Sequence, residues 1–577
     1  MSLLAVLLVY ARPADLGNGT YQNPILFGDY SDPDVIRVGS DYYLVSSSFH
    51  FMPGIPILKS HDLVNWTIIG HVYQRLELDP KYSLIGGNRY ARGSWAPAIR
   101  YHRGRFYVYF PTPDEGILMS SAKSAEGPWT TPVLVLAKKG LEDPCPFWDD
   151  DGSAYLVHSV VGAGPLILHR MNPEGTAVLD EGQVIARDPQ ALPTLEGPKL
   201  YKRNGYYYIF APFGGVSAGS QAVLRSKNIY GPYESKTVLA QGATSINGPH
   251  QGGYVETPSG EGWFLHFQQR GAYGRIVHMQ PVRWMEDWPV MGEGGQPVAT
   301  AKKPDVGRVY PASEPQTSDE FNTRLLGPQW EWNHNPDNAH WSLSERPGFL
   351  RLHAMPADDL LSARKTLTLT PQDPALNAVV LLDVKGMADN QRAGLGMFFQ
   401  WPIGLAWCRA AGNATLPCSP MEWRRPARAW HRSKFNCAYI SKKRPPLTPT
   451  ASMEAGRSPH SAPSCRSPSV GGRERVFVCL ASTKAAIRAT RALPISTGFT
   501  TKPRLQSDEE PLQSPAFSRR GPNGCGPRRC RQTRPANGGL LTAAAMMACS
   551  PNGFPKHGWK ARWEGLRPLG TLPGATA

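Results

Sequence analysis

The chain has 577 residues, of which 41% are hydrophobic and 10% aromatic, enough to fill the cores of two to four domains. No run approaches the roughly 18 apolar residues of a membrane-spanning helix, so no membrane span is expected. The net charge of +16 would suit a nucleic-acid partner. However, residues 1–400 hold 34 basic and 39 acidic residues, whereas residues 401–577 hold 28 basic and 7 acidic ones. The basic character therefore belongs to the tail only, and no nucleic-acid partner is expected.

The chain begins with a short apolar run, Leu3 to Tyr10. Its length suits the hydrophobic part of a signal peptide, although no Lys or Arg precedes it. Two interpretations of residues 1–20 stay open, a signal remnant and an N-terminal extension that forms a strand. The first favours a periplasmic or extracellular location over a cytoplasmic one.

Five short strand-like runs then recur, with first residues 65, 48, 52 and 57 positions apart, and a tight turn precedes each run. The runs are DYYLV at 41–45, FYVYF at 106–110, AYLVH at 154–158, YYYIF at 206–210 and WFLHF at 263–267. No long amphipathic pattern lies between them. Repeating all-β units of this size are typical of propeller blades. We therefore predict an all-β protein with a five-bladed β-propeller over residues 21–305.

A second all-β region follows the repeats. Residues 340–354, 363–371, 377–386 and 392–400 alternate between apolar and polar side chains, as strands of an antiparallel sandwich do. Four strands make about half of such a domain. We therefore expect a partial β-sandwich over residues 315–400, with strand edges that lack partners.

The composition changes abruptly after residue 400. Eight of the nine cysteines follow this position, and only Cys145 precedes it, so the propeller and sandwich have no internal disulfide. Residues 401–577 contain one tyrosine and are rich in Cys, Pro and Arg. We interpret them as a disordered tail translated in the wrong frame, which would leave the sandwich truncated and could inactivate the product. A genuine basic extension that binds nucleic acid is the alternative, although the CGPRRC cysteines have no second pair for zinc.

Five residues occupy matching positions, 9 to 13 residues before the recurrent runs: Asp32, Trp95, Asp143, Glu196 and His250. The innermost strand of each blade lines the channel of a propeller. We therefore expect these five side chains to converge at one end of the channel. Each has a proline within two residues, which restrains the backbone there.

Three carboxylates in one pocket would interact strongly. Like charges disfavour ionisation, so one carboxyl can stay protonated while another is ionised. A protonated acid opposite an ionised base is what glycoside hydrolysis requires. The simpler interpretation is that each acid caps a turn or pairs with a surface lysine, and the matched positions in three blades argue against it.

The sequence resembles glycoside hydrolase family 43. The resemblance rests on the opening stretch from NPILFGDYSDPDVIRVGSDYYLV to HDLVNW, and on four later blocks in the same order: GSWAPAIRYHRGRFYVYF, EDPCPFWDDDGSAYLV, LEGPKLYKRNGYYYIF and GRIVHMQPV. It covers about residues 21–400. Residues from 318 onward (SDEFN, QWEWNHNPDNAHWSLSERPGFLRL) resemble the C-terminal sandwich of the xylosidase-like members, which implies an exo-acting enzyme.

The resemblance implies a role for each matching residue. Asp32 matches the general base, Glu196 the general acid, and Asp143 the carboxylate that orients the acid and tunes its pKa. The family's enzymes invert the anomeric configuration.

The resemblance also implies a sugar site. Arg275 matches an arginine that contacts the sugar, and Phe49 and Trp95 match aromatic residues that wall the sugar subsite. His250 matches a channel histidine that sits, in many members, beside a water-coordinated Ca²⁺. Such an ion would be structural, and no other cofactor is expected.

We therefore expect release of terminal xylose or arabinofuranose from xylan or arabinoxylan oligosaccharides. The sequence does not choose between the two sugars, and it leaves the oligomeric state open. Two alternatives remain: a sugar-binding propeller without catalysis, and a retaining fructan-cleaving propeller, in which the two carboxyl groups would lie only about 5–5.5 Å apart.

Overall fold

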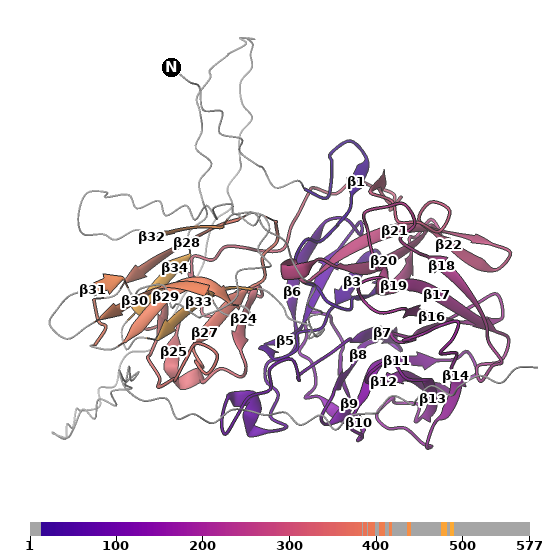
Figure 1. Cartoon of the computed structure of the whole chain (residues 1–577), viewed down its shortest axis with the longest axis horizontal. Coiled ribbons are helices and arrows are strands. Elements are labelled where there is room, and N and C mark those ends of the chain that lie inside the picture. Colours follow the sequence, from indigo (N-terminus) through magenta and orange to yellow (C-terminus); the bar gives the residue numbers. More distant parts are fainter. Residues whose placement is uncertain are drawn as a thin grey trace, which may run out of the picture.

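The structure, a computed structural model, describes residues 13–374, 376–383, 385–388 and 391–398, together with five later strands. Apart from three 3-10 turns, the described residues form only strands and loops, which confirms the all-β prediction. In this described part no helix is long and apolar enough to cross a membrane. The apolar run at residues 3–10 lies outside the described residues. Figure 1 shows two bodies side by side, a propeller and a sandwich.

The propeller has five antiparallel four-stranded sheets, as predicted. From the innermost strand outward, the blades are β2 (Asp34–Val38), β3 (Asp41–Val45), β5 (Gly54–Ser60) and β6 (Trp66–Tyr73); β7 (Ala98–His102), β8 (Arg105–Thr112), β9 (Gly116–Ala122) and β10 (Val133–Leu136); β11 (Leu141–Trp148), β12 (Ala154–Val160), β13 (Leu166–Met171) and β14 (Gln183–Ala186); β15 (Lys199–Arg203), β16 (Tyr206–Phe213), β17 (Ser220–Ser226) and β18 (Glu234–Leu239); β19 (His250–Glu256), β20 (Gly262–Gln269), β21 (Arg275–Met285) and β22 (Trp288–Met291).

The recurrent runs of the sequence are the second strands of the blades, β3, β8, β12, β16 and β20. Their side chains are buried on both faces, because each blade packs between two others, and this explains their near-continuous apolar character. A short pair outside the blades, β1 (Thr20–Gln22) with β23 (Thr300–Lys302), joins the two ends of the propeller. Tyr21 of β1 packs against Trp263 of the fifth blade.

The second body is a two-sheet sandwich. Its strands before residue 400 are β24 (Trp330–Asn333), β25 (Trp341–Ser342), β26 (Leu350–Leu352), β27 (Thr366–Leu369), β28 (Leu376–Asp383) and β29 (Arg392–Phe398). Trp330, Trp332, Leu350 and Leu367 form its core together with inward-facing residues of β28 and β29. The sandwich that the sequence predicts is therefore present.

Beyond residue 400 the sequence predicts a disordered tail, but five segments there are strands. These are β30 (Ile403–Arg409), β31 (Thr415–Pro417), β32 (Phe435–Tyr439), β33 (Arg475–Ala481) and β34 (Ala485–Ala489). β33 lies between β27 and β29, and β34 lies between β26 and β28, so the edges expected to be open have partners. An open strand edge favours pairing with any extended segment of suitable apolar character. The other residues after 410 lie outside the described residues, and for them the disordered tail stays a prediction.

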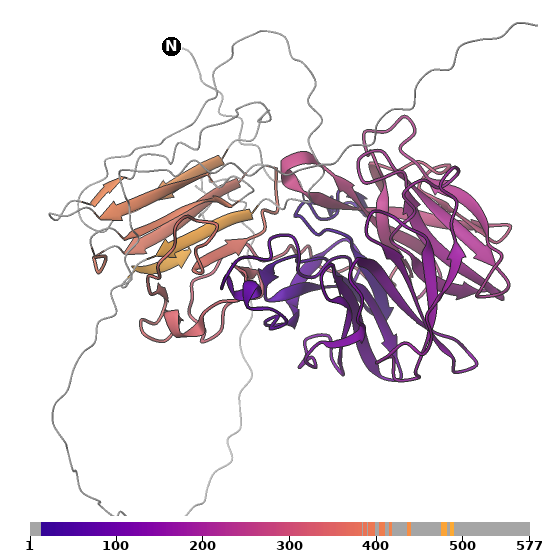
Figure 2. The same ribbon diagram turned by 60° about the horizontal axis from the view of Figure 1, so that its bottom comes forward.

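The two bodies share one sheet. The seven-stranded sheet of the sandwich ends in β24 and then β4 (Phe51–Met52), a two-residue strand of the propeller. Trp332 pairs with Met52, and Asn333 pairs with Phe51. The turned view in Figure 2 shows the sandwich against the same flank of the propeller. The sandwich thus contacts the loop that follows the second strand of the first blade.

Candidate active site

The innermost strands bring the five predicted channel residues to equivalent positions. Asp32 lies two residues before β2, Trp95 three before β7 and Glu196 three before β15, whereas Asp143 lies inside β11 and His250 opens β19. All five therefore lie at the N-terminal ends of the inner strands. The alignment follows from the repeat, because each blade starts with the same strand at the channel.

Asp32 lies in a charged and donor-rich setting. Its Oδ1 forms an ion pair with the Arg275 guanidinium, and its Oδ2 accepts a hydrogen bond of 2.6 Å from the Ser47 hydroxyl. The Asp32 side chain is only 5% exposed. Arg275 opens β21, and its backbone N–H donates to Asp29 (3.0 Å), which fixes the start of that strand. Each oxygen of the Asp32 carboxylate therefore has a donor of its own.

The opposite group contains three acids and no arginine. One carboxylate oxygen from each of Glu142, Asp143 and Glu196 lies within 4.8 Å of the other two. Glu142 and Asp143 are buried, and the Glu196 side chain is 20% exposed. Such a set could hold a cation, but it also suits the sharing of protons between neighbouring carboxyls.

A β-bulge explains how two adjacent residues reach the same group. The pairing of β11 with β12 shifts register between Glu142 and Cys145, and Asp143 has a φ of 56°. Successive side chains of a regular strand point to opposite faces, whereas a bulge redirects one of them. Asp32 has a φ of 55° at the matching place in the first blade. Aspartate tolerates this left-handed region better than most residues.

Asp143 is tied to the segment that carries Glu196. Its Oδ2 accepts hydrogen bonds from the backbone N–H of Gly197 (2.8 Å) and from the Ser159 hydroxyl (3.2 Å). Gly197 has a φ of +61°, and a Cβ there would come within 2.9 Å of the Gln251 side chain. The positive φ and the packing against Gln251 therefore both favour glycine at the position whose N–H holds Asp143.

Burial raises the pKa of Asp143, and the nearby charge of Glu196 raises it further. The charge of Lys199 and the Gly197 N–H act in the opposite direction. Burial also raises the pKa of Glu142, followed in effect by the charges of Asp143 and Glu196. At neutral pH this group therefore retains at least one proton.

His250 lies beside Glu196. Its ring is buried, and its Nε2 lies 3.1 Å from Glu196 Oε1. The rings of Phe267 on β20 and His250 are in contact, with 5.3 Å between their centroids. The Arg275 guanidinium lies 4.7 Å from the centre of the Phe267 ring. One buried aromatic ring of the fifth blade therefore supports a residue on each side of the site.

The two predicted wall residues are linked through their backbones. Phe49 and Ser94 exchange two hydrogen bonds of 2.8 and 3.0 Å, and the Trp95 indole N–H donates to the Ala91 carbonyl (2.7 Å). A Cβ at Gly93 would lie 1.8 Å from the Phe49 carbonyl oxygen, so only glycine fits there.

The sequence reasoning missed Glu142, Lys199 and Phe267. Glu142 precedes Asp143 in LEDPC, and an alternating strand would have directed it away from the channel. Lys199 is fully buried on β15, three residues after Glu196, where a lysine would be expected at the surface. Phe267 ends a recurrent run whose pattern predicts a strand but no role in the site. The adjacent acids were the one available signal.

The arrangement combines a carboxylate paired with a guanidinium and a separate group of carboxyls that retains a proton. Such a pair can remove a proton from one reacting group and donate a proton to another in the same reaction. Hydrolysis of a glycosidic bond needs these two transfers on opposite faces of a sugar.

Two family models match the chain. Residues 21–289 match the model described as glycosyl hydrolases family 43, and residues 318–401 match the β-xylosidase C-terminal concanavalin A-like domain. The first match runs from β1 into β22, the last strand of the fifth blade. The second match ends where the composition changes.

Three relatives illustrate the similarity. A protein of Xylanibacter ruminicola with the name "Putative beta-xylosidase" is 52% identical over 401 residues, which cover 68% of this chain and 74% of that protein. A beta-xylosidase of Formosa agariphila is 41% identical, with coverage of 59% and 63%. A non-reducing end alpha-L-arabinofuranosidase of Bacteroides ovatus is 34% identical, with coverage of 61% and 68%.

Solved structures agree in fold. The xylan beta-1,4-xylosidase of Bacillus halodurans superposes with a TM-score of 0.65 at 26% identity, over 82% of this chain and 100% of that one. A family 43 protein of Bacillus licheniformis superposes with a TM-score of 0.60 at 29% identity, over 70% and 84%.

Proposed function

This chain belongs to glycosyl hydrolase family 43, and we propose that it releases single terminal pentoses, xylose or arabinofuranose, from xylan or arabinoxylan oligosaccharides with inversion. The names of the relatives support both sugars. The sandwich supports exo action, because the family model it matches is that of β-xylosidases.

One observation carries the proposal. Asp32 is paired with a cation, whereas Glu142, Asp143 and Glu196 share a space with no arginine. The first arrangement favours a base and the second an acid. A protein that only binds sugars has no use for this separation of protonation states.

In the proposed reaction Asp32 accepts a proton from a water molecule as its oxygen attacks the anomeric carbon. Glu196 donates a proton to the glycosidic oxygen as the carbon–oxygen bond breaks. The water oxygen enters on the face opposite the leaving group, so the sugar is released with inverted configuration. Asp143, held by the Gly197 N–H, orients the Glu196 carboxyl.

Arg275, Phe49 and Trp95 would form the sugar subsite. The Arg275 guanidinium can pair with Asp32 and still donate to a sugar hydroxyl, because it carries five N–H groups. Aromatic rings at Phe49 and Trp95 offer the apolar faces against which sugar rings pack. Their linked backbones would hold the two rings as one wall.

A Ca²⁺ ion near His250 is part of the proposal. Both ring nitrogens of His250 are buried without a well-aligned hydrogen-bond partner among the described residues, which fits a water-filled site. Calcium prefers oxygen ligands, so the histidine would hold it through water. The ion would supply positive charge near Glu196. Retention of the transition temperature and activity after chelation would argue against it.

The experiment is hydrolysis of nitrophenyl β-xyloside and nitrophenyl α-L-arabinofuranoside, with proton NMR of the first sugar released. We expect turnover of at least one substrate and an inverted anomer. Sugar binding without turnover would favour the non-catalytic alternative, and a retained anomer would exclude the proposed mechanism.

A further inference from the structure

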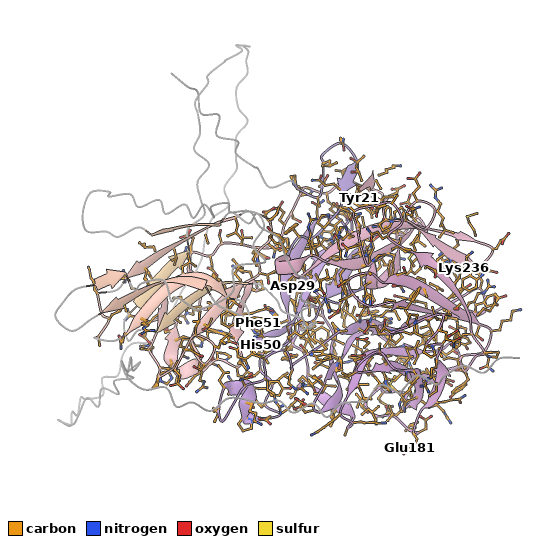
Figure 3. All side chains as sticks on the ribbon, viewed as in Figure 1. Tyr21, Asp29, His50, Phe51, Glu181 and Lys236 are labelled. Atoms are coloured by element: carbon orange, nitrogen blue, oxygen red, sulfur yellow. The ribbon has the colours of Figure 1, made fainter. Side chains whose placement is uncertain are left out.

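The sandwich contacts the propeller loops that carry Phe49 and Trp95 through three consecutive residues at the end of β24. Asn333, His334 and Asn335 have 0%, 0% and 1% of their surface exposed. Figure 3 labels His50 and Phe51 of the propeller on the flank that faces the sandwich. Phe51 pairs with Asn333 in the shared sheet.

His334 joins two propeller loops. Its backbone N–H donates to the His50 carbonyl (3.1 Å), and its Nε2 accepts from the backbone N–H of Arg89 (3.0 Å). Its Nδ1 lies 2.8 Å from Asn333 Oδ1, which can only accept, so Nδ1 carries the proton. Burial lowers the pKa of His334 to about 3, which is consistent with a neutral ring that donates at one nitrogen and accepts at the other.

Both loops carry a wall residue. His50 follows Phe49 directly, and its Nδ1 accepts from the Ala91 N–H (3.3 Å). Ala91 in turn accepts the Trp95 indole N–H. The route from His334 to each aromatic ring is therefore short and runs through hydrogen bonds.

The neighbours of His334 reinforce the contact. Asn335 makes three hydrogen bonds to Leu76 and Ser83, and its backbone N–H donates to Tyr82 (2.8 Å). The Asn333 amide donates to the Tyr90 hydroxyl (2.7 Å). The loop from Leu76 to Trp95 is thus held to the sandwich at several points. Two of these residues, Asn333 and His334, also bond to the loop that carries Phe49, and His334 does so through its backbone N–H.

We propose that His334 is a positioning residue through which the sandwich sets the spacing of Phe49 and Trp95, and hence the affinity of the site for a pentose. The proposal rests on the proposed function, because it takes these two residues as the sugar wall. It assigns the sandwich a part in substrate binding that requires no sandwich residue to touch the sugar.

The test uses the full chain with two substitutions. His334→Leu removes both side-chain hydrogen bonds at similar volume, whereas His334→Gln keeps an acceptor near Nε2. The control is Gln316→Leu. Gln316 lies in the segment between β23 and β24, and its replacement removes two hydrogen bonds to Ile68 on β6, away from the wall. Binding of free xylose and of free arabinose by calorimetry is the primary measurement, since it needs no turnover, and KM, kcat and the pH profile are measured where hydrolysis occurs.

We expect His334→Leu to weaken pentose binding and raise KM about 10-fold, as for one lost buried hydrogen bond. kcat should change less than about 3-fold, both limbs of the pH profile should stay in place, and His334→Gln should restore most of the affinity. Gln316→Leu should lower the transition temperature without changing affinity. Unchanged affinity in a folded His334→Leu protein, or a fall in kcat alone, would overturn the proposal.

A double-mutant cycle separates positioning from general stability. If His334 acts through Phe49, His334→Leu should have little further effect on affinity in a Phe49→Ala background, and the same holds for Trp95→Ala. Additive effects in both backgrounds would overturn the proposal while leaving the wall intact. Normal affinity in both Phe49→Ala and Trp95→Ala would show that neither residue forms a sugar wall, and this would also overturn the proposal. Failure of hydrolysis with normal sugar binding would count only against the proposed function.

Discussion

The two sides of the active site contain the same functional group in opposite surroundings. Asp32 is paired with Arg275 and accepts from Ser47, so both of its oxygens have donors. Glu142 and Asp143 lie beside each other and Glu196, and the charge of Lys199 acts against the raised pKa of Asp143. The burial of Asp32 and Asp143 is similar, at 3% and 5% exposed, so burial alone does not distinguish them.

Under the proposed mechanism, the partners of a carboxyl, more than its depth, assign the roles of acid and base. A cation and a hydroxyl stabilise a carboxylate, whereas a second buried carboxyl disfavours it. One propeller can therefore place chemically equivalent residues at matching blade positions and still give them different roles. Four substitutions test this comparison.

The largest effect should come from Asp32→Asn. The variant keeps the shape of the side chain but cannot accept the proton of water, so kcat should fall about 10²–10⁴-fold, the usual contribution of a general base. Steady-state kinetics on the nitrophenyl glycoside would measure it. Asp41→Asn, which changes a surface ion pair in the same blade, is the control and should be nearly normal. Comparable activity in the two variants would refute the role of Asp32.

Removal of the Arg275 guanidinium should have the next largest effect. Arg275→Met leaves Asp32 buried without its ion-pair partner, a change that typically costs about 3–5 kcal/mol in stability. We expect a lower transition temperature and a loss of kcat/KM. Arg275→Lys should recover stability better than activity, because lysine supplies charge without the planar fork. A stable Met variant would mean that the pair contributes little.

Asp143→Asn should move the pH profile. The charge of Asp143 opposes ionisation of the neighbouring carboxyls, so its removal should let them lose their proton at lower pH. The acid must be protonated to act, and the basic limb of kcat/KM should therefore move to lower pH, by about one unit. An unmoved limb would mean that Asp143 only orients Glu196.

The smallest effect on activity is expected for Glu142→Gln, since glutamine resembles a protonated glutamate. kcat/KM at neutral pH should stay within about 3-fold. Stability should respond to pH: because the folded-state pKa of Glu142 is raised, wild-type stability is lost as pH rises from about 4 towards the folded value. In thermal unfolding from pH 5 to 9, the transition temperature of the variant should rise relative to that of the wild type. A constant difference would mean that Glu142 is ionised in the folded protein.

Much of the fold was predictable because the propeller repeats. Five apolar runs with turns before them predicted five blades, and the structure confirms this architecture. The sandwich was also predicted, from alternation in four segments. The strands after residue 400 were not, because β33 and β34 acquire their strand geometry by pairing with β27, β29, β26 and β28. The local composition of the tail does not predict that pairing.

The same limit applies within the site. The positions of Asp32, Asp143 and Glu196 followed from their distance to the repeated strands, and the roles proposed for them from a family resemblance. The place of Glu142 depends on a bulge, which alternation along a strand cannot foresee. His334 lies in a different body of the molecule, and its bonds to the loops that carry Phe49 and Trp95 form only where the two bodies pack together.

The sequence by itself determined the repeat, and with it which residue of each blade starts at the channel, because hydrophobic spacing and turns are local properties. It also determined the family. Only the tertiary structure decided which carboxylate has an arginine beside it, which acids are close enough to share protons, and which sandwich residue contacts the loops that carry Phe49 and Trp95. These depend on the distances between blades and between the two bodies, and electrostatic and hydrogen-bond energies change steeply with such distances.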